Sequence, residues 1–150
     1  MCLHFCNQRR LHSDPELHLR NRLIPVVEEA KFLGVIFDRK LSFIPHLKYL
    51  RNKCCKAINL LKVISCKGWG SDTDTLLKLY RALIRSKLDY GCIVYGSARK
   101  SYLQLLDPIK NQALRICLGA FRTSPMKSLE VEANELPLIL RREKLFSIRM

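Results

Sequence analysis

The residues of this chain whose types and spacing could do chemistry are its cations. Every charged side chain from residue 39 to residue 71 is basic, and the next acidic residue is Asp72. Cations without neighbouring carboxylates attract polyanions, and contacts of this kind to phosphates give affinity without sequence choice. A basic run is also found as a plain solvated helix face, so both interpretations stand at this point. The cations of the segment are Arg39, Lys40, Lys48, Arg51, Lys53, Lys56, Lys62 and Lys67.

The composition of the whole chain agrees with a polyanionic partner. The 150 residues carry a formal net charge of +14, and 48% of them are hydrophobic, which is enough for a packed core. Nucleic acid is the commonest partner of so basic a chain, and a membrane surface is the alternative. No stretch reaches the ~18 apolar residues that a membrane span requires, and Arg9 and Arg10 interrupt the only apolar run near the N-terminus. We therefore expect no membrane partner and a cytoplasmic or nuclear location.

We find no catalytic constellation in the sequence. It contains no adjacent aspartate pair, no phosphate-binding loop of P-loop spacing and no Gly-x-Ser-x-Gly motif. Cys2 and Cys6 lie near His4 and His12, but no second ligand pair at zinc-like spacing follows. We predict no catalytic and no metal-binding residues, and reduced thiols that pack in the core.

The pattern predicts a mostly α-helical fold with a short β-hairpin at its front. Apolar, β-branched runs at 23–27 and 32–37 are joined by a polar turn at 28–30, which is typical of an antiparallel hairpin. Gly34 would then lie inside the second strand, at a bulge or where another backbone approaches closely.

Helical spacing of apolar residues begins after this hairpin. The first predicted helix spans 41–66, with Ser42 as its N-cap, and 67–70 ends it and leaves Trp69 to stack on a base or to anchor the core. Further helices are predicted over 75–88, from Ser97 or Ser101 to 118, over 126–132 and from Pro137 onwards. Pro108 should kink or split the third helix, Gly119 should end it, and Asp72 or Asp74 should cap the second.

Several stretches, in order, closely resemble the downstream part of a reverse transcriptase from a non-LTR (LINE-type) retrotransposon of the jockey or I-like group. The resemblance covers nearly the whole chain. It rests on Lys31-Phe-Leu-Gly-Val-Ile-Phe-Asp38, Leu41-Ser-Phe43 with His46, Leu79-Tyr-Arg-Ala-Leu-Ile-Arg-Ser-Lys-Leu-Asp-Tyr-Gly-Cys92, Tyr95-Gly-Ser-Ala98, the segment from Leu106 to Pro125, Glu135-Leu-Pro137 and Arg141-Arg142.

The resemblance implies a role for each part of the chain. Residues 1–40 would be a palm remnant whose Phe32, Leu33 and Gly34 form a primer-grip-like hairpin. Residues 41–70 would be a basic thumb-like helix, and residues 71–150 the helical thumb and connection region. The nucleic-acid-binding residues would be Lys48, Arg51, Lys53, Lys56 and Lys62.

The chain departs from the family in lacking the palm aspartates that bind the catalytic ions. We therefore expect a fragment that grips a template–primer duplex, an RNA–DNA hybrid or another nucleic-acid duplex, and that is inactive alone. It would bind no cofactor, Mg²⁺ being expected only in a full-length polymerase, and the missing palm and fingers would be a further partner. Since the chain starts in mid-strand and its last helix has no cap, we expect it to belong to a longer one. The alternatives are a stand-alone basic helical module that binds nucleic acid or protein, and a retroelement relic without function.

Overall fold

The computed structural model describes residues 1–6, 14–65 and 71–148. As predicted, the described chain is mostly α-helical, with a few short strands near its N-terminus. It divides into two compact units, Met1–His46 and Leu47–Met150. The boundary lies in the first turn of the longest helix, α1 (Ile44–Ile64). Each unit is described by itself below.

The described strands all lie in the first unit, and they pair two by two. One pair is parallel, with Cys2 opposite Val26, and the other two are antiparallel. The pairs are β1 (Cys2–Leu3) with β4 (Val26–Val27), β2 (His18–Leu19) with β3 (Arg22–Leu23), and β5 (Glu29–Phe32) with β6 (Val35–Asp38).

The predicted hairpin is wrong in its placement. Its two strands are Glu29–Phe32 and Val35–Asp38, so the first strand occupies most of the predicted turn and the second apolar run contains the actual turn. Leu23, Val26 and Val27 belong to other strand pairs. Gly34 is neither a bulge nor a close approach inside a strand, because the pairing of Phe32 with Val35 leaves Leu33 and Gly34 as a two-residue turn. Both have positive φ, 45° and 80°, as a type I′ turn requires. The antiparallel hairpin was predicted, but the glycine of the apolar run lies in its turn.

The carboxylate of Asp38 organises the link from this hairpin to α1. It accepts hydrogen bonds from the Ser42 amide at 3.0 Å, the Ser42 hydroxyl at 2.8 Å and the Phe43 amide at 2.7 Å. Partial burial raises the pKa of Asp38, but these bonds outweigh it, and the pKa lies below its usual value. The helix begins at Ile44, three residues later than predicted, and Ser42 Oγ accepts a bond from the Ile44 amide. The cap predicted at Ser42 is thus shared with Asp38.

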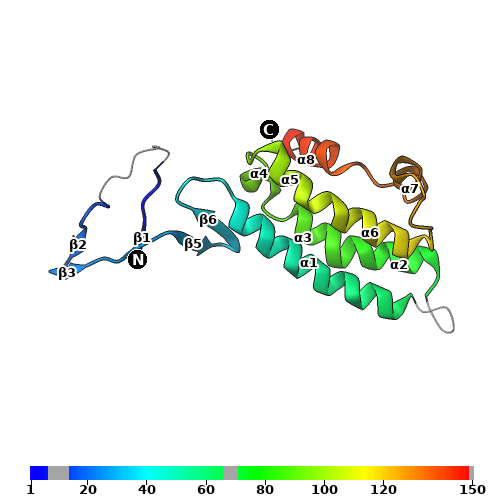
Figure 1. Ribbon diagram of the computed structural model, residues 1–150, viewed down its shortest axis with the longest axis horizontal. Helices are drawn as coiled ribbons and strands as arrows, with labels where there is room; N and C mark the ends of the chain where they lie inside the picture. Colours follow the sequence, from blue (N-terminus) through cyan, green and yellow to red (C-terminus); the bar gives the residue numbers. More distant parts are fainter. Residues whose placement is uncertain (7–13, 66–70, 149–150) are drawn as a thin grey trace. The chain divides into compact units, whose positions relative to one another are not determined.

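The second unit is built from helices that follow one another with short links. After α1 come α2 (Thr73–Tyr80), a π-helical turn η1 (Arg81–Arg85), α3 (Ser86–Asp89), α4 (Cys92–Tyr95), α5 (Lys100–Leu103), a 3₁₀ turn η2 (Gln104–Leu106), α6 (Asp107–Cys117), α7 (Met126–Glu132) and α8 (Leu138–Ser147). In Figure 1 α1 runs from left to right, the stretch from α2 to α3 returns from right to left, and α6 runs from left to right again. The core lies between these three.

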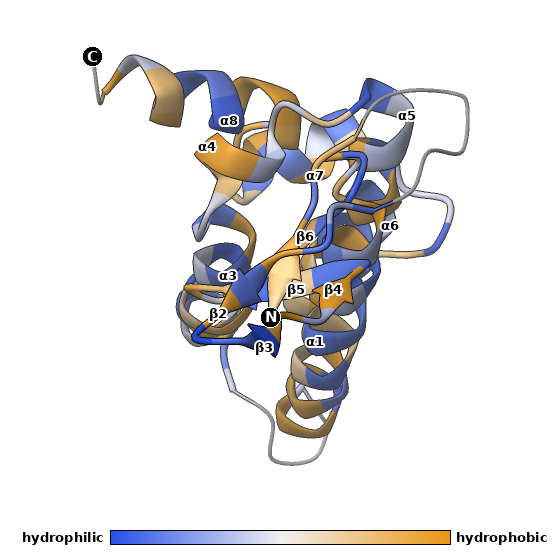
Figure 2. Ribbon diagram, turned by 90° about the vertical axis from the view of Figure 1, so that its left-hand side faces the viewer, coloured by the Kyte–Doolittle hydropathy of each residue, from blue (hydrophilic) through white to orange (hydrophobic). Residues whose placement is uncertain are grey.

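The predicted apolar stripes form this core. On α1 the buried residues recur at three- and four-residue spacing, and Figure 2 shows hydrophobic and hydrophilic positions alternating along the helix. The buried set includes Leu47, Leu50, Cys54, Ala57, Ile58 and Leu61 on α1, Leu76, Leu77, Tyr80, Ile84 and Leu88 on the returning helix, and Leu103, Leu106, Ile109, Ala113, Leu114 and Cys117 on the third.

The ends of the helices also follow the sequence signals. Asp72 caps α2 by accepting a bond from the Thr75 amide, and Pro108 lies in the first turn of α6, where the predicted third helix is split. Gly119, at φ 61°, ends α6 in a Schellman motif, because the Ala120 amide bonds to the Arg115 carbonyl at 3.0 Å. The short apolar stretch at 92–95, for which the sequence predicts no helix, forms α4.

Trp69, Cys66 and His12 lie outside the described residues. Cys54, Cys92 and Cys117 are buried, as predicted, while Cys55 is exposed. No helix within residues 1–6, 14–65 and 71–148 has both the length and the hydropathy to cross a membrane.

Candidate nucleic-acid interface

The five cations predicted to bind nucleic acid all lie on the exposed side of α1. We call Lys48, Arg51, Lys53, Lys56 and Lys62 the α1 basic face; each of them is exposed, and the buried stripe of α1 occupies the opposite side. A helix turns by about 100° per residue, so Lys48, Arg51 and Lys62 lie within about 60° of one another around α1, while Lys56 lies about 80° and Lys53 about 140° from Lys48. The sequence alone placed these residues correctly on a solvent-facing surface.

The α1 basic face differs from an ordinary charged surface in its lack of acidic partners. Among the residues that the structure describes, Lys48, Arg51, Lys53 and Lys56 form no salt bridge. The ammonium group of Lys53 lies 5.6 Å from the ring centre of Tyr49, a cation–π distance. With no carboxylate to neutralise them, these cations keep their full charge for a ligand.

The primer-grip-like residues of the sequence prediction form the tip of the β5–β6 hairpin. The side chains of Phe32 and Leu33 are exposed, with 66% and 74% of their surface accessible. Leu33 at φ 45° holds a conformation that costs a non-glycine residue roughly 1–2 kcal/mol. The hairpin therefore exposes two apolar side chains on a strained turn. Burial of these side chains does not offset the strain, because they are exposed.

A buried histidine supports this hairpin. His46 is 3% exposed, and its Nδ1 accepts a hydrogen bond from the Ile36 amide of β6 at 3.3 Å. Burial lowers the pKa of His46, and the charge of Lys31 lowers it further. The imidazole is thus neutral near pH 7, as its acceptor role requires. The sequence singled out His46 only as part of a motif, and its contact with Ile36 could not be predicted.

Four other cations of the second unit are paired with acids. Arg81 and Arg85, on the π-helical turn, both donate to Glu135 Oε1, at 2.8 and 2.9 Å. Arg141 of α8 contacts Asp89 at 2.7 Å, and Lys110 of α6 contacts Glu130 of α7. These contacts join segments that are distant in the sequence, including the link between α7 and α8 that carries Glu135, so their cations are part of the packing rather than of a ligand surface.

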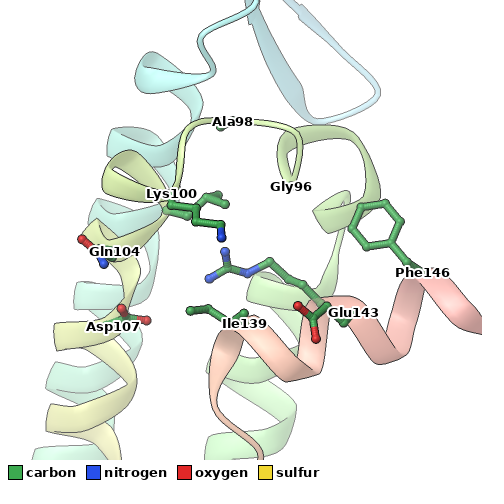
Figure 3. Close-up of a pocket in the computed structure, with 10 residues that line it drawn as sticks. Gly96, Ala98, Lys100, Gln104, Asp107, Ile139, Glu143 and Phe146 are labelled. Carbon is green, nitrogen blue, oxygen red and sulfur yellow. The ribbon is translucent and has the colours of Figure 1, made fainter.

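A cavity of about 260 Å³ lies between α8 and the segment from Gly96 to Asp107. Figure 3 shows Phe146 and Ile139 of α8 at its apolar wall and the ammonium group of Lys100 pointing inward. A Cβ on Gly96 would lie 3.2 Å from the Phe146 ring, so the glycine permits this close packing. Lys100 and Arg142 line the cavity together with the carboxylates of Asp107 and Glu143. Because the two charges of each sign balance, the cavity lacks the one-signed field that a polyanion would select.

The described residues offer no site for a catalytic metal ion. No three side chains of histidine, cysteine, aspartate or glutamate are grouped within the described ranges so as to hold one. His4 instead contacts Asp14 at 3.3 Å. We derive no metal-dependent step from this part of the chain.

Comparison with known proteins identifies relatives over most of the chain. It is 30% identical, over 82% of its own length and 12% of the relative's, to a "Retrovirus-related Pol polyprotein from type-1 retrotransposable element R1" of Bradysia coprophila. It is 25% identical, over 76% of its length, to a "Probable RNA-directed DNA polymerase from transposon X-element" of Drosophila melanogaster. It is also 25% identical, over 79% of its length, to an "RNA-directed DNA polymerase from mobile element jockey" of Drosophila funebris.

These matches cover a small part of the relatives, since the chain spans only 12% to 13% of the length of these three. No protein-family model matches the chain. No solved structure matches it either.

Proposed function

We propose that this chain, whose relatives over most of its length are non-LTR retrotransposon RNA-directed DNA polymerases, grips a template–primer duplex without adding nucleotides itself. The preferred ligand is an RNA–DNA hybrid, the duplex on which an RNA-directed DNA polymerase extends DNA. The observation that carries the proposal is the α1 basic face, where Lys48, Arg51, Lys53 and Lys56 are exposed and form no salt bridge within the described residues. Cations in this state gain most from phosphates, since they give up no salt bridge on binding.

In this proposal α1 acts as a thumb-like helix that follows the phosphate backbone. Lys48 and Lys62 are 14 residues apart, and a rise of 1.5 Å per residue separates their Cα atoms by about 21 Å. Phosphates of one strand of a nucleic-acid duplex are spaced several ångströms apart, so the face contacts several of them in one binding event. Contacts of this type fix position and affinity, and sequence preference must come from elsewhere.

The hairpin tip supplies a second, apolar contact in the same proposal. Phe32 and Leu33 would lie against sugar and base atoms at the end of the primer strand, and Gly34 permits the tight turn that presents them. Aromatic and apolar side chains gain from such contacts because every base has an apolar face.

The proposal also states that the chain binds duplex but does not extend it. Polymerisation by two metal ions requires carboxylates that hold both ions, and the described residues provide no such group. We expect no nucleotide incorporation by this chain on a primed RNA template with Mg²⁺ and deoxynucleotides. Incorporation above background, abolished by removal of Mg²⁺, would contradict this part of the proposal.

The test is binding of the purified chain to a labelled RNA–DNA hybrid across a salt series. Beside it we would measure a variant in which Lys48, Arg51, Lys53 and Lys56 are changed to glutamine. Wild-type affinity should fall steeply with salt, and every phosphate that a substitution leaves without its cation should reduce the log–log slope by about 0.7 to 0.9.

A matched control removes the same number of positive charges, four, from other helices. Lys78, Lys100, Lys127 and Lys144 are exposed on α2, α5, α7 and α8, and they form no salt bridge within the described residues. Changing these four to glutamine should leave the slope nearly as in the wild type. Equal losses in both variants would indicate a general charge effect. Binding that ignores both salt and the α1 substitutions would favour an apolar, protein-binding surface instead.

A further inference from the structure

A second cavity, of about 430 Å³, adjoins one end of the α1 basic face. It lies between the last turn of α1, the C-terminal half of α6 and the segment that follows α6. Its lining residues are Lys62, Gln112, Arg115, Ile116, Ala120 and Arg122. Three of these are cations, one is an amide and none is acidic, in contrast to the charge-balanced cavity of Figure 3.

The inference is based on the side chain of Arg115. Its Nε is buried, and among the described residues no acceptor forms a hydrogen bond with it. A buried donor without an acceptor costs roughly 1–3 kcal/mol and is uncommon in folded proteins. The positive position of Arg115 near the end of α6 agrees with the helix dipole, but the dipole does not require a buried Nε. An anion that accepts from Nε does account for it.

The end of α6 brings the remaining cation to the cavity. Gly119 adopts φ 61° and the Ala120 amide bonds back to the Arg115 carbonyl, which reverses the chain direction after the helix. The reversal sets Arg122 on the cavity wall with Arg115, seven residues earlier. Since Lys62 belongs to both the cavity and the α1 basic face, the two surfaces are continuous.

We propose that this cavity binds one phosphate group of the nucleic-acid backbone, as an anchor at the end of the α1 basic face. The inference rests on the proposed function, which it deepens by naming a further set of contacts. A guanidinium group presents a planar fork of donors that matches two phosphate oxygens, so Arg115 donates from Nε and one Nη to the same phosphate. Arg122, Lys62 and the Gln112 amide surround the other oxygens.

The first experiment tests the anion site without nucleic acid. The Nε–H resonance of Arg115 in the ¹⁵N-labelled chain is followed while inorganic phosphate is added at constant ionic strength. We expect a saturable shift of this resonance, which is assigned by its absence from the spectrum of Arg115→Lys. A resonance that stays unchanged, or that moves no more than those of arginines in salt bridges such as Arg141, would overturn the proposal.

The second experiment asks whether the anion is a backbone phosphate. Arg115→Lys keeps the charge but removes the fork, and we expect it to weaken hybrid binding about tenfold, which corresponds to one charge-assisted contact. Arg122→Gln should weaken binding by a similar factor and reduce the salt slope by about one unit. Lys127→Gln, an exposed cation on α7, is the control and should change binding less than twofold.

The outcomes separate this inference from the proposed function. If the α1 variant loses hybrid binding while Arg115→Lys binds as the wild type does, the cavity proposal fails and the thumb-like grip stands. If hybrid binding is absent altogether while phosphate still shifts the Arg115 resonance, the duplex grip fails and the cavity is an anion site of another kind. Weakened binding in both variants supports both proposals.

Discussion

Two regions of the second unit hold their cations in opposite ways. On the α1 basic face, Lys48, Arg51, Lys53 and Lys56 are exposed, and the described residues give them no carboxylate partner. On η1, α6 and α8, by contrast, Arg81, Arg85, Lys110 and Arg141 each contact an acid of another element. Lysine and arginine are therefore exposed to solvent in one region and form salt bridges in the other, and the positions of the acidic residues determine this difference.

The net charge of +14 is not spread evenly between these two regions. Three acids of this chain, Asp89, Glu130 and Glu135, join segments of its C-terminal half, and Glu135, whose side chain is only 4% exposed, contacts two arginines. Part of the excess positive charge lies on α1, whose own sequence contains no acidic residue. A substitution in the paired region should lower stability and leave nucleic-acid binding unchanged. A substitution on α1 should weaken nucleic-acid binding and leave stability nearly unchanged.

The largest effect on stability should come from Lys110→Met. The Lys110 side chain is 2% exposed, contacts Glu130, and donates from Nζ to the Leu136 carbonyl at 2.7 Å. Removing the ammonium group leaves both acceptors without their donor, and breaking a buried pair costs about 3–5 kcal/mol. Urea unfolding of the wild type and the variant would measure the loss. Lys127→Met, at an exposed position of α7, is the control and should cost no more than about 0.5 kcal/mol. A loss below about 1 kcal/mol for Lys110→Met would show that the pair is not structural.

A smaller loss is expected when the pH is lowered, and it should be located in the first unit. The pKa of His46 is held below its usual value by burial and by Lys31. The unfolded chain therefore binds a proton more readily than the folded one. The contribution of His46 to stability is thus full above about pH 6.5 and is lost as the pH falls toward the lowered pKa. The pH dependence of the Ile36 amide and His46 ring resonances measures this directly. Titration of His46 at or above the usual histidine pKa would contradict it.

The core was predictable from the sequence because helical periodicity is a local property. The buried stripe on α1, the Asp72 cap and the Gly119 C-terminus all depend on residues within a few positions of one another. The exposed placement of Lys48 and its neighbours follows from the same periodicity. Local chemistry was enough wherever the relevant partner is one or two turns away.

What could not be predicted depends on contacts between residues that are distant in the sequence. Glu135 lies 54 and 50 residues from Arg81 and Arg85, and Lys62 lies 53 residues from Arg115 in the second cavity. Nothing in the sequence near Lys110 indicates that it is buried. The hairpin was misplaced for another reason: Leu33 and Gly34 lie in an apolar run that favours a continuous strand, and a leucine is rarely chosen for a left-handed turn position.

That turn gives a prediction in which stability and binding move in opposite directions. Leu33→Asn should stabilise the hairpin by about 1 kcal/mol, because asparagine followed by glycine suits a type I′ turn and Leu33 has φ 45°. The same change removes an exposed apolar side chain from the proposed primer contact, so hybrid binding should weaken severalfold. Unfolding and hybrid binding of the same preparation test both parts. A variant that is more stable and binds equally well would remove Leu33 from the interface.

The smallest change in the free energy of unfolding is expected for the α1 variant. It contrasts with the large loss expected for Lys110→Met. Changing Lys48, Arg51, Lys53 and Lys56 to glutamine removes no salt bridge of the described residues, and Lys53 and Lys56 are like charges three positions apart on one helix. Removing such repulsion gains a few tenths of a kcal/mol, so the free energy of unfolding should stay within about 0.5 kcal/mol of the wild type or rise slightly. Urea unfolding in the buffer of the hybrid assay measures it. If the variant were destabilised by more than about 1 kcal/mol, its weaker binding would reflect unfolding, and the separation between ligand-binding and structural cations would fail.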